Sequence, residues 1–246
     1  MKFFFHIGQY FMMLKRVFAK PEKHKLYIRQ LFLELDSLGV NSVWIVIIIS
    51  IFIGGIMTIQ FSYSMSNPIY PTTLIGLGTR DTLILEFSST MMALILAGKI
   101  GSNITSEIGT MRVTEQIDSL EIMGVNSASY LILPKIIAVV FIFPFLFIVS
   151  VFFGLLGGLV TGPVTGVITA DQFIEGIQWL FVPYYVTFSI IKTFFFGFLV
   201  ASVPAYFGYH VQGGALDVGK ASTQAVVNTN ILILLFDLIL TQLLLT

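Results

Sequence analysis

The acidic side chains best placed to form a binding surface lie close together in one short segment. On a helical wheel, four of them gather on one side: Glu107, Glu115, Asp118 and Glu121. The apolar residues on the other side are Val113, Ile117 and Leu120. Such a helix cannot span a membrane, and we expect it to lie flat at the surface with its acidic face outward. An acidic face suits a partner that offers Arg or Lys, although a solvated connector would show the same pattern.

Other kinds of chemistry find little support in the sequence. The chain has no cysteine, which excludes disulfides, thiolate catalysis and cysteine-bound metal. His6, His24 and His210 lie far apart and show no metal-ligand spacing. No G-x-x-x-x-G-K-[ST] phosphate loop occurs, so ATP hydrolysis would need another chain. We therefore expect no catalytic residue, no metal and no cofactor in this chain.

The composition is that of a membrane protein. Of 246 residues, 56% are hydrophobic and only 11% are charged, with a mean hydropathy of +0.93. A soluble domain carries about a quarter charged residues, so most of this surface must face lipid. The net charge is zero, which gives no indication of nucleic-acid binding.

Five stretches are long and apolar enough to be membrane-spanning helices. They cover residues 43–65, 82–104, 130–160, 181–203 and 224–245. The third is longer than a bilayer requires, so it should tilt, bend at Pro144 or extend beyond the bilayer. Alternating period-2 patterns are absent, which argues against a transmembrane barrel. The fold class is an all-α integral membrane protein of five transmembrane helices, with loops over residues 66–81 and 161–180.

Basic residues predict the orientation. Seven of them precede the first span: Lys2, Lys15, Arg16, Lys20, Lys23, Lys25 and Arg29. The loop after the first span has only Arg80, and residues 161–180 contain no Lys or Arg. The positive-inside rule then places the N-terminus and the acidic segment in the cytoplasm and the C-terminus outside.

The first forty residues form a separate N-terminal segment in this reading, before a permease-like domain at residues 41–246. No small-residue cleavage site follows the apolar start, so a signal peptide is not expected. In residues 25–38, apolar side chains recur at helical spacing: Ile28, Leu31, Phe32, Leu35 and Leu38. This pattern predicts an amphipathic helix in the membrane interface that stops at Gly39, or a helix packed on the cytoplasmic end of the bundle.

Small residues recur every four positions near the end of the third span. They are Ser150, Gly154, Gly158, Gly162 and Gly166, and Gly54–Gly55 in the first span is a weaker instance. Such ridges allow close helix contacts in lipid. The ridge could pack within one subunit or at a dimer seam.

Residues 93–125, ALILAGKIGSNITSEIGTMRVTEQIDSLEIMGV, resemble the signature of the MlaE-type permeases, the membrane subunits of MCE-associated lipid ABC transporters. The resemblance continues through YLILPKIIA, GYHVQGGALDVGKASTQAVV and DLILTQLLL, and FIGGIMTIQ resembles the family's first-span pattern. It implies a homodimer bound to two cytoplasmic ATPases, which hold the ATP and Mg²⁺, and an outward-facing MCE-domain protein. The implied role is phospholipid movement between the inner membrane and the outer membrane.

The same resemblance assigns roles to individual residues. The segment from Glu107 to Gly124 would be a cytoplasmic coupling helix between spans two and three. Its expected ATPase contacts are Glu107, Thr110, Met111, Arg112, Glu115, Asp118, Ser119 and Glu121. An outward-opening lipid pocket at the dimer interface, between the first and fifth spans, would be lined by Met57, Gln60, Phe61, Ser64, Met65 and, at its mouth, Glu86. Taken singly, these residues are equally compatible with ordinary lipid-facing or core positions.

Three charged residues lie inside the predicted spans, where charge is costly: Lys99, Lys192 and Asp237. We expect Lys192 and Asp237 to face the bundle interior, paired with each other or with Lys99, although Lys192 could snorkel to an interface. The sequence departs from the family where Leu85 replaces an Arg, Ser89 replaces a Pro and Lys99 replaces an Arg.

Two other classes of protein are alternatives to a lipid ABC permease. An ion- or proton-coupled secondary transporter could use Glu86, Lys192 and Asp237 as relays, but no internal repeat is visible. A membrane-embedded enzyme would need a metal cluster or a Ser–His arrangement, and neither is evident.

Overall fold

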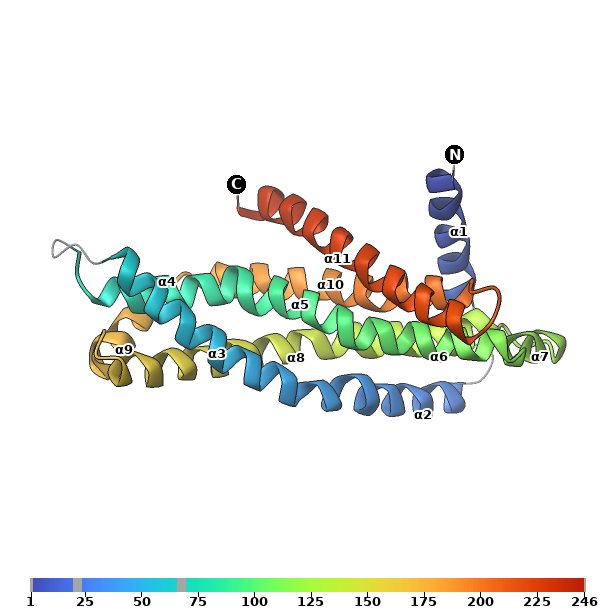
Figure 1. Ribbon diagram of the computed structural model, residues 1–246, viewed down its shortest axis with the longest axis horizontal. Helices are drawn as coiled ribbons and strands as arrows, with labels where there is room; N and C mark the ends of the chain where they lie inside the picture. The colour runs from blue at the N-terminus through green and yellow to red at the C-terminus, as the bar shows by residue number, and fades with distance from the viewer. Residues whose placement is uncertain (1, 20–23, 66–69, 246) are drawn as a thin grey trace. The chain divides into compact units, whose positions relative to one another are not determined.

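The computed structural model describes residues 2–19, 24–65 and 70–245, and within these ranges the chain is all-α and contains no strand (Figure 1). The α-helices are α1 Lys2–Val17, α2 His24–Glu34, α3 Asn41–Ser64, α4 Thr73–Thr82, α5 Met92–Leu96, α6 Ser102–Val113, α7 Gln116–Ile122, α8 Ser127–Val164, α9 Ala170–Gln178, α10 Pro183–Tyr209 and α11 Ala215–Leu245. Three π-helical segments join some of them: η1 Leu35–Val40, η2 Leu83–Met91 and η3 Ala97–Gly101.

Five of the described helical segments are long and apolar enough to cross a membrane, as the sequence predicted. They are Tyr27–Ser64, Thr73–Val113, Ser127–Val164, Pro183–Tyr209 and Ala215–Leu245. The second segment is longer than predicted because it begins with α4 and ends with α6, and the helical backbone continues between them through η2, α5 and η3. The third continues through Pro144 as the single helix α8.

The chain divides into two compact units. Unit 1 comprises Met1–Asn41, Ala93–Phe143 and Phe194–Thr246, and unit 2 comprises Ser42–Met92 and Pro144–Thr193. Helices α8 and α10 each contribute residues to both units. The predicted division at residue 40 stays a prediction.

In unit 1, α6 packs closely on α10 and α11, and Figure 1 shows α6 beside the start of α11. A Cβ on Gly109 would lie 3.0 Å from Val218, and one on Gly208 would lie 2.8 Å from the Thr105 carbonyl oxygen. The Thr105 hydroxyl donates to the Pro204 carbonyl at 3.0 Å. Glycine and a small hydroxyl residue therefore bring these helices into backbone contact.

In unit 2, the ridge of small residues on α8 packs against α3. A Cβ on Gly54 would lie 1.8 Å from the Gly154 carbonyl oxygen, and one on Gly157 would lie 2.1 Å from that of Ile51. The Ser50 hydroxyl donates to the Ser150 hydroxyl at 2.8 Å. The ridge therefore closes a contact within one subunit, which is one of the two arrangements that the pattern allowed.

Residues 66–81 and 161–180, which were both predicted as loops, contain the helices α4 and α9. Helices α4 and α9 lie side by side at the end of unit 2 (Figure 1). A small core of Ile75, Ile168 and Phe173 holds them together. Thr169 begins α9 with a capping box that it shares with Gln172. The loop prediction was wrong because these helices are too short to give a span-length apolar pattern.

Two predicted helix boundaries were also wrong. Gly39 does not stop a helix, since η1 continues through it into α3; a Cβ at Gly39 would lie 2.7 Å from Ile142, so glycine serves close packing here. The expected single helix from Glu107 to Gly124 is broken between α6 and α7, where Glu115 adopts a left-handed backbone with φ of 60°.

Candidate functional site

The acidic segment forms a bend of two helices, with Glu115 at the corner. A non-glycine residue in the left-handed region is uncommon, and such residues mark turns or strained functional positions. Glu115 is exposed, and its carbonyl accepts hydrogen bonds from the backbone and side chain of Ser119 in α7. The corner therefore presents one carboxylate to solvent while the backbone beneath it is satisfied.

Two of the four acidic residues, Glu107 and Glu121, bind side chains that lie outside the bend. Glu107 accepts from the buried Lys135 ammonium at 2.8 Å, and Lys135 also binds Glu34 of α2 at 2.5 Å. Glu121 accepts from the Ser127 hydroxyl at 2.9 Å and from the Tyr209 hydroxyl at 3.0 Å. The hydrogen bond from Ser127 is the main cause that holds the pKa of Glu121 below its ordinary value.

The remaining predicted contacts lie around the bend. Arg112 at the end of α6 forms a 2.5 Å ion pair with Asp118 of α7, which ties the two helices together. The Thr110 hydroxyl donates to the Ser106 carbonyl of its own helix. Met111 is half-buried. The exposed acidic surface is therefore narrower than the wheel predicted and centres on Glu115 and the half-exposed Asp118.

Sequence reasoning missed the apolar tip of this segment. Ile122 is 87% exposed and Met123 is 68% exposed, at the end of α7. Gly124 follows with φ of 78° and turns the chain toward α8. Two large apolar side chains directly before a turn glycine were the available signal. Together with Glu115 and Asp118 they make a protruding surface with an acidic side and an apolar end, which we call the α7 tip.

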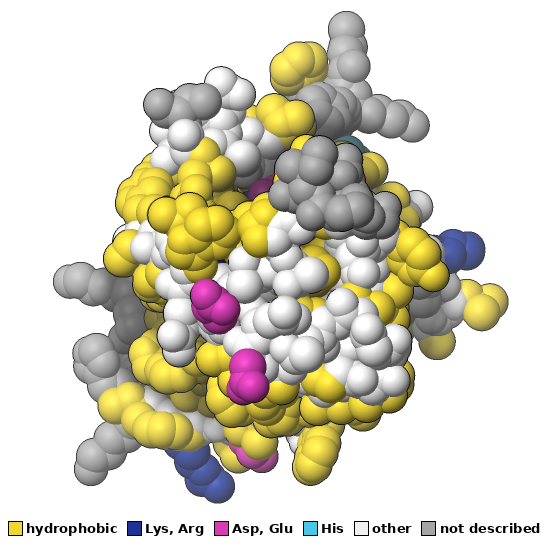
Figure 2. All heavy atoms as spheres, turned by 90° about the vertical axis from the view of Figure 1, so that its left-hand side faces the viewer, with side chains coloured by type: hydrophobic (Ala, Val, Ile, Leu, Met, Phe, Trp, Pro, Cys, Tyr) yellow, Lys and Arg dark blue, Asp and Glu magenta, His cyan; other side chains and the backbone are white. Residues whose placement is uncertain are grey.

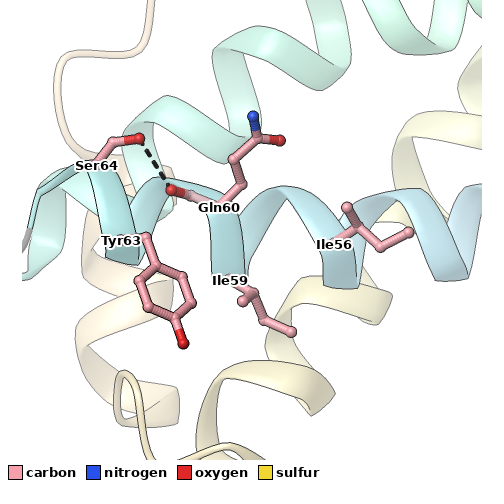
Figure 3. A pocket seen from close by; sticks show the side chains of 5 residues that line it. All are labelled: Ile56, Ile59, Gln60, Tyr63 and Ser64. Carbon is pink, nitrogen blue, oxygen red and sulfur yellow. Dashed lines mark hydrogen bonds between the residues drawn. The ribbon is translucent and has the colours of Figure 1, made fainter.

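A hollow of about 550 Å³ lies along one side of α3 in unit 2 (Figure 3). It is lined by Ile56, Ile59, Gln60, Tyr63 and Ser64. The Ser64 hydroxyl donates to the Gln60 backbone carbonyl at 3.0 Å (Figure 3). The Gln60 side chain itself is exposed. The lining is mostly apolar with a few polar groups, as lipid-binding surfaces require.

The structure brings together only part of the predicted lipid pocket. Gln60 and Ser64 line the hollow. Phe61 and Met65 instead pack on the Ile75–Phe173 core, where the Phe61 ring lies close to Gly78. Met57 is half-buried and does not line it.

Glu86 lies in unit 2 and binds Lys192. The two Glu86 carboxylate oxygens are 3.3 Å from the Lys192 ammonium, which also donates to the Leu85 carbonyl at 3.1 Å. Lys192 is fully buried and lies 4.9 Å above the Phe188 ring, whereas Glu86 is 42% exposed. The pair therefore places a neutralised but polar group at a partly open position in an apolar segment. Pairing of Lys192 with Asp237 stays a prediction.

Lys99 occupies a different environment. Its side chain is exposed, and its ammonium donates to the Asn41 carbonyl at the start of α3.

Arg80 is a further residue whose place the sequence did not reveal, because it was counted as a loop charge. Its side chain is only 2% exposed. It donates to the Ile177 carbonyl in the last turn of α9 at 2.6 Å, and to the carbonyls of Trp179 and Leu180, just after α9, at 2.8 Å and 3.3 Å. Asp81 neutralises it at 2.7 Å. The face that carries α4 and α9 is mostly apolar or uncharged, with isolated acidic side chains (Figure 2). Arg80 therefore stabilises this end of unit 2 from inside.

No group of three or more His, Asp or Glu side chains that could hold a metal ion occurs in the described part of the chain.

The family profile described as "Permease MlaE" matches residues 31–243. The chain belongs to the MlaE permease family. As a member, it shares with the family nearly everything from α2 to the end of α11, whereas α1 lies before the match.

Similarity to individual proteins covers most of the chain. A "Probable ABC transporter permease protein" of Rickettsia bellii is 31% identical over 89% of this chain and 84% of its own length. "Intermembrane phospholipid transport system permease protein MlaE" of Haemophilus influenzae is 30% identical over 94% of this chain and 88% of its own. "Protein TRIGALACTOSYLDIACYLGLYCEROL 1, chloroplastic" of Arabidopsis thaliana is 28% identical over 89% of this chain and 63% of its own.

Proposed function

We propose that this MlaE-family chain is the membrane permease subunit of an ABC transporter that moves phospholipid or a similar lipid. The family match across five apolar helical segments is the observation that carries the proposal. Relatives named as ABC transporter permeases, and one named for intermembrane phospholipid transport, support it. The chain would be a multi-pass protein of a bacterial inner membrane, with its N-terminus in the cytoplasm and its C-terminus in the periplasm.

The physical need for such a machine follows from the cost of exposing lipid to water. Each methylene that leaves an apolar medium costs about 0.8 kcal/mol, or roughly 12 kcal/mol for a chain of about fifteen. A transporter must therefore offer an apolar surface and an input of energy. The hollow beside Gln60 offers such a surface in unit 2. All of its lining residues come from the single helix α3, so a second copy of the chain would supply the opposite wall of the lipid pocket.

The energy would come from a separate ATPase bound at the α7 tip. Two such ATPases, holding ATP and Mg²⁺, would serve a homodimer of permeases, and an MCE-domain protein would receive or deliver lipid on the outer side. Ile122 and Met123 supply an apolar anchor, and Glu115 and Asp118 supply charge for Arg or Lys on the ATPase. The Arg112–Asp118 ion pair and the Lys135 cluster would transmit movement of the tip to α6 and α8.

Charge reversal at Glu115 and introduction of a charge at Ile122 test this coupling. Glu115→Lys and Ile122→Glu should each reduce co-purification of the ATPase by about tenfold, because each places an unfavourable group in the contact. Glu175→Lys in α9 is a matched control, since Glu175 is exposed and lies in unit 2. Equal recovery of the ATPase with all three variants would contradict the proposed role of the tip.

The Glu86–Lys192 pair, in which the ammonium is buried and the carboxylate is partly exposed, favours one alternative, a transporter driven by an ion or proton gradient. The two functions differ in their energy source. Lipid movement that requires ATP and persists when the proton gradient is collapsed supports the ABC permease, and the reverse result supports the alternative.

A further inference from the structure

A cavity of about 460 Å³ lies in unit 1, where α1, the end of α10 and the start of α11 meet. It is separate from the hollow on α3, which belongs to unit 2. Its polar lining comprises His6 and Gln9 of α1, Tyr206, His210 and Gln212 at and after the end of α10, and Asp217, Lys220 and Gln224 of α11. Two imidazoles, an ammonium and amide groups in one cavity form a set of hydrogen-bond donors for an anion.

Tyr206 fixes both imidazoles of this cavity. The His210 Nδ1 atom is 3.0 Å from the Tyr206 carbonyl, which can only accept, so Nδ1 carries the proton. The Tyr206 hydroxyl donates to Gln9 at 3.1 Å and lies 2.8 Å from His6 Nδ1, which therefore donates to it. Within the described part of the chain, neither Nε2 atom makes a hydrogen bond. Protonation of either ring would turn its Nε2 into a donor for a ligand.

One cation and one carboxylate, Lys220 and Asp217, lie in the same cavity as these rings. Lys220 is 73% exposed and binds Asp217 at 3.0 Å, and Asp217 also accepts from the Gly214 amide. Burial is the main cause that lowers the pKa of His210, and the positive charge of Arg112 acts in the same direction, as does His6. An anion in the cavity would offset both effects and favour the protonated ring.

We propose that this cavity binds the anionic phosphodiester headgroup of a membrane lipid, with His6, His210 and Lys220 as its donors. The apolar part of the lining, which includes Phe5 and Phe207, suits the glycerol and upper acyl region of such a lipid. Phe4 and Phe5 are 77% and 62% exposed on α1, as expected of a helix that faces an apolar medium. Basic pockets beside transmembrane helices are suited to headgroup binding.

A nucleotide is a poorer fit. Residues 214–220 have the glycine and lysine spacing of a phosphate loop, but Ala221 stands where that loop needs a hydroxyl. From Ala215 onward these residues form the helix α11, so they cannot wrap their amides around a triphosphate.

Titration calorimetry on the full-length chain in detergent tests the proposal. The probe is dioctanoyl phosphatidylglycerol, whose charge is constant between pH 6 and 8, with dioctanoylglycerol as the ligand that lacks phosphate. We expect binding of the first alone, and stronger binding at pH 6 than at pH 8. Lys220→Gln should weaken it about fivefold, whereas Asp217→Asn should tighten it by releasing Lys220. Lys15→Gln, an exposed α1 position outside the cavity, should leave it unchanged.

The variants keep the test decisive even if one of them folds poorly. Lys220 is exposed and Asp217→Asn is expected to gain affinity, so neither result depends on damage to the fold. The double variant His6→Gln/His210→Gln should abolish the dependence on pH. Equal binding of both lipids, an unchanged affinity with Lys220→Gln, or inorganic phosphate alone binding as tightly as the lipid would overturn the assignment.

Discussion

Lys135 holds three helices of unit 1 together, and its replacement by methionine gives the sharpest stability prediction. The Lys135 side chain is 1% exposed and binds two carboxylates, those of Glu34 in α2 and Glu107 in α6. Lys135→Met keeps the apolar stem but leaves both carboxylates without their counter-ion. Removing one partner from a buried ion pair costs about 3–5 kcal/mol. For a chain of this size, that corresponds to a fall in melting temperature of roughly 6–20 °C.

The two carboxylates should not contribute equally. Glu34 is 11% exposed, whereas Glu107 is 47% exposed and keeps much of its hydration. Glu107→Gln should therefore cost less than about 1 kcal/mol, as exposed pairs do. Glu34→Gln should cost more, and Glu34→Gln/Lys135→Met should recover part of the loss seen with Lys135→Met alone.

Thermal unfolding of purified variants in one detergent measures these differences, with retention on size-exclusion chromatography as the control for folding. A double-mutant cycle gives the coupling energy of each pair. A melting temperature of Lys135→Met within about 2 °C of wild type, or a stronger coupling of Lys135 to Glu107 than to Glu34, would contradict this role of Lys135.

Three other perturbations probe different parts of the fold. Gly54→Ala places a methyl group 1.8 Å from a backbone carbonyl of α8 and should cost about 1–3 kcal/mol in thermal unfolding, whereas Gly98→Ala, with nothing within 4 Å, should be neutral. Arg80→Met leaves the carbonyls at the end of α9 without their donor. The free energy of local opening there should fall by about 1–3 kcal/mol, so amide hydrogen exchange should become faster. Unchanged exchange would argue against this role of Arg80. The pKa of Glu121 is lowered in the folded state, so its stabilising effect is complete at neutral pH and is lost as pH falls through that lowered value. Ser127→Ala should weaken this acid dependence, which is measured as the pH dependence of amide hydrogen exchange in α7. An identical pH profile in the variant would count against a role of the Ser127 hydrogen bond.

The sequence predicted the features that depend on long apolar patterns. Five segments of span length were visible because each is predominantly apolar over about twenty residues or more, and the structure has five such segments among its described helices. The small-residue ridge was also visible, since its four-residue period is a property of helices. Its partner was not, because Gly54 and Gly154 come together only through the packing of α3 on α8.

The features that the sequence did not predict depend on contacts between distant residues. Arg80 looked like a loop charge because its carbonyl partners lie about a hundred positions later. Glu107 looked available to a partner because its contact with Lys135 could not be read from a helical wheel. The break at Glu115 was missed because a glutamate rarely adopts a left-handed backbone, so no turn residue marked it.

ATP-dependent lipid transfer is the direct measurement of whether this chain is the permease of a lipid ABC transporter. The chain is reconstituted with its ATPase in liposomes that contain a fluorescent phospholipid, and transfer of that lipid to acceptor vesicles is followed. We expect transfer that requires ATP hydrolysis, persists without a proton gradient and is lost with Glu115→Lys while the variant still inserts in the membrane. Transfer at the same rate without ATP, or driven by a proton gradient alone, would contradict it.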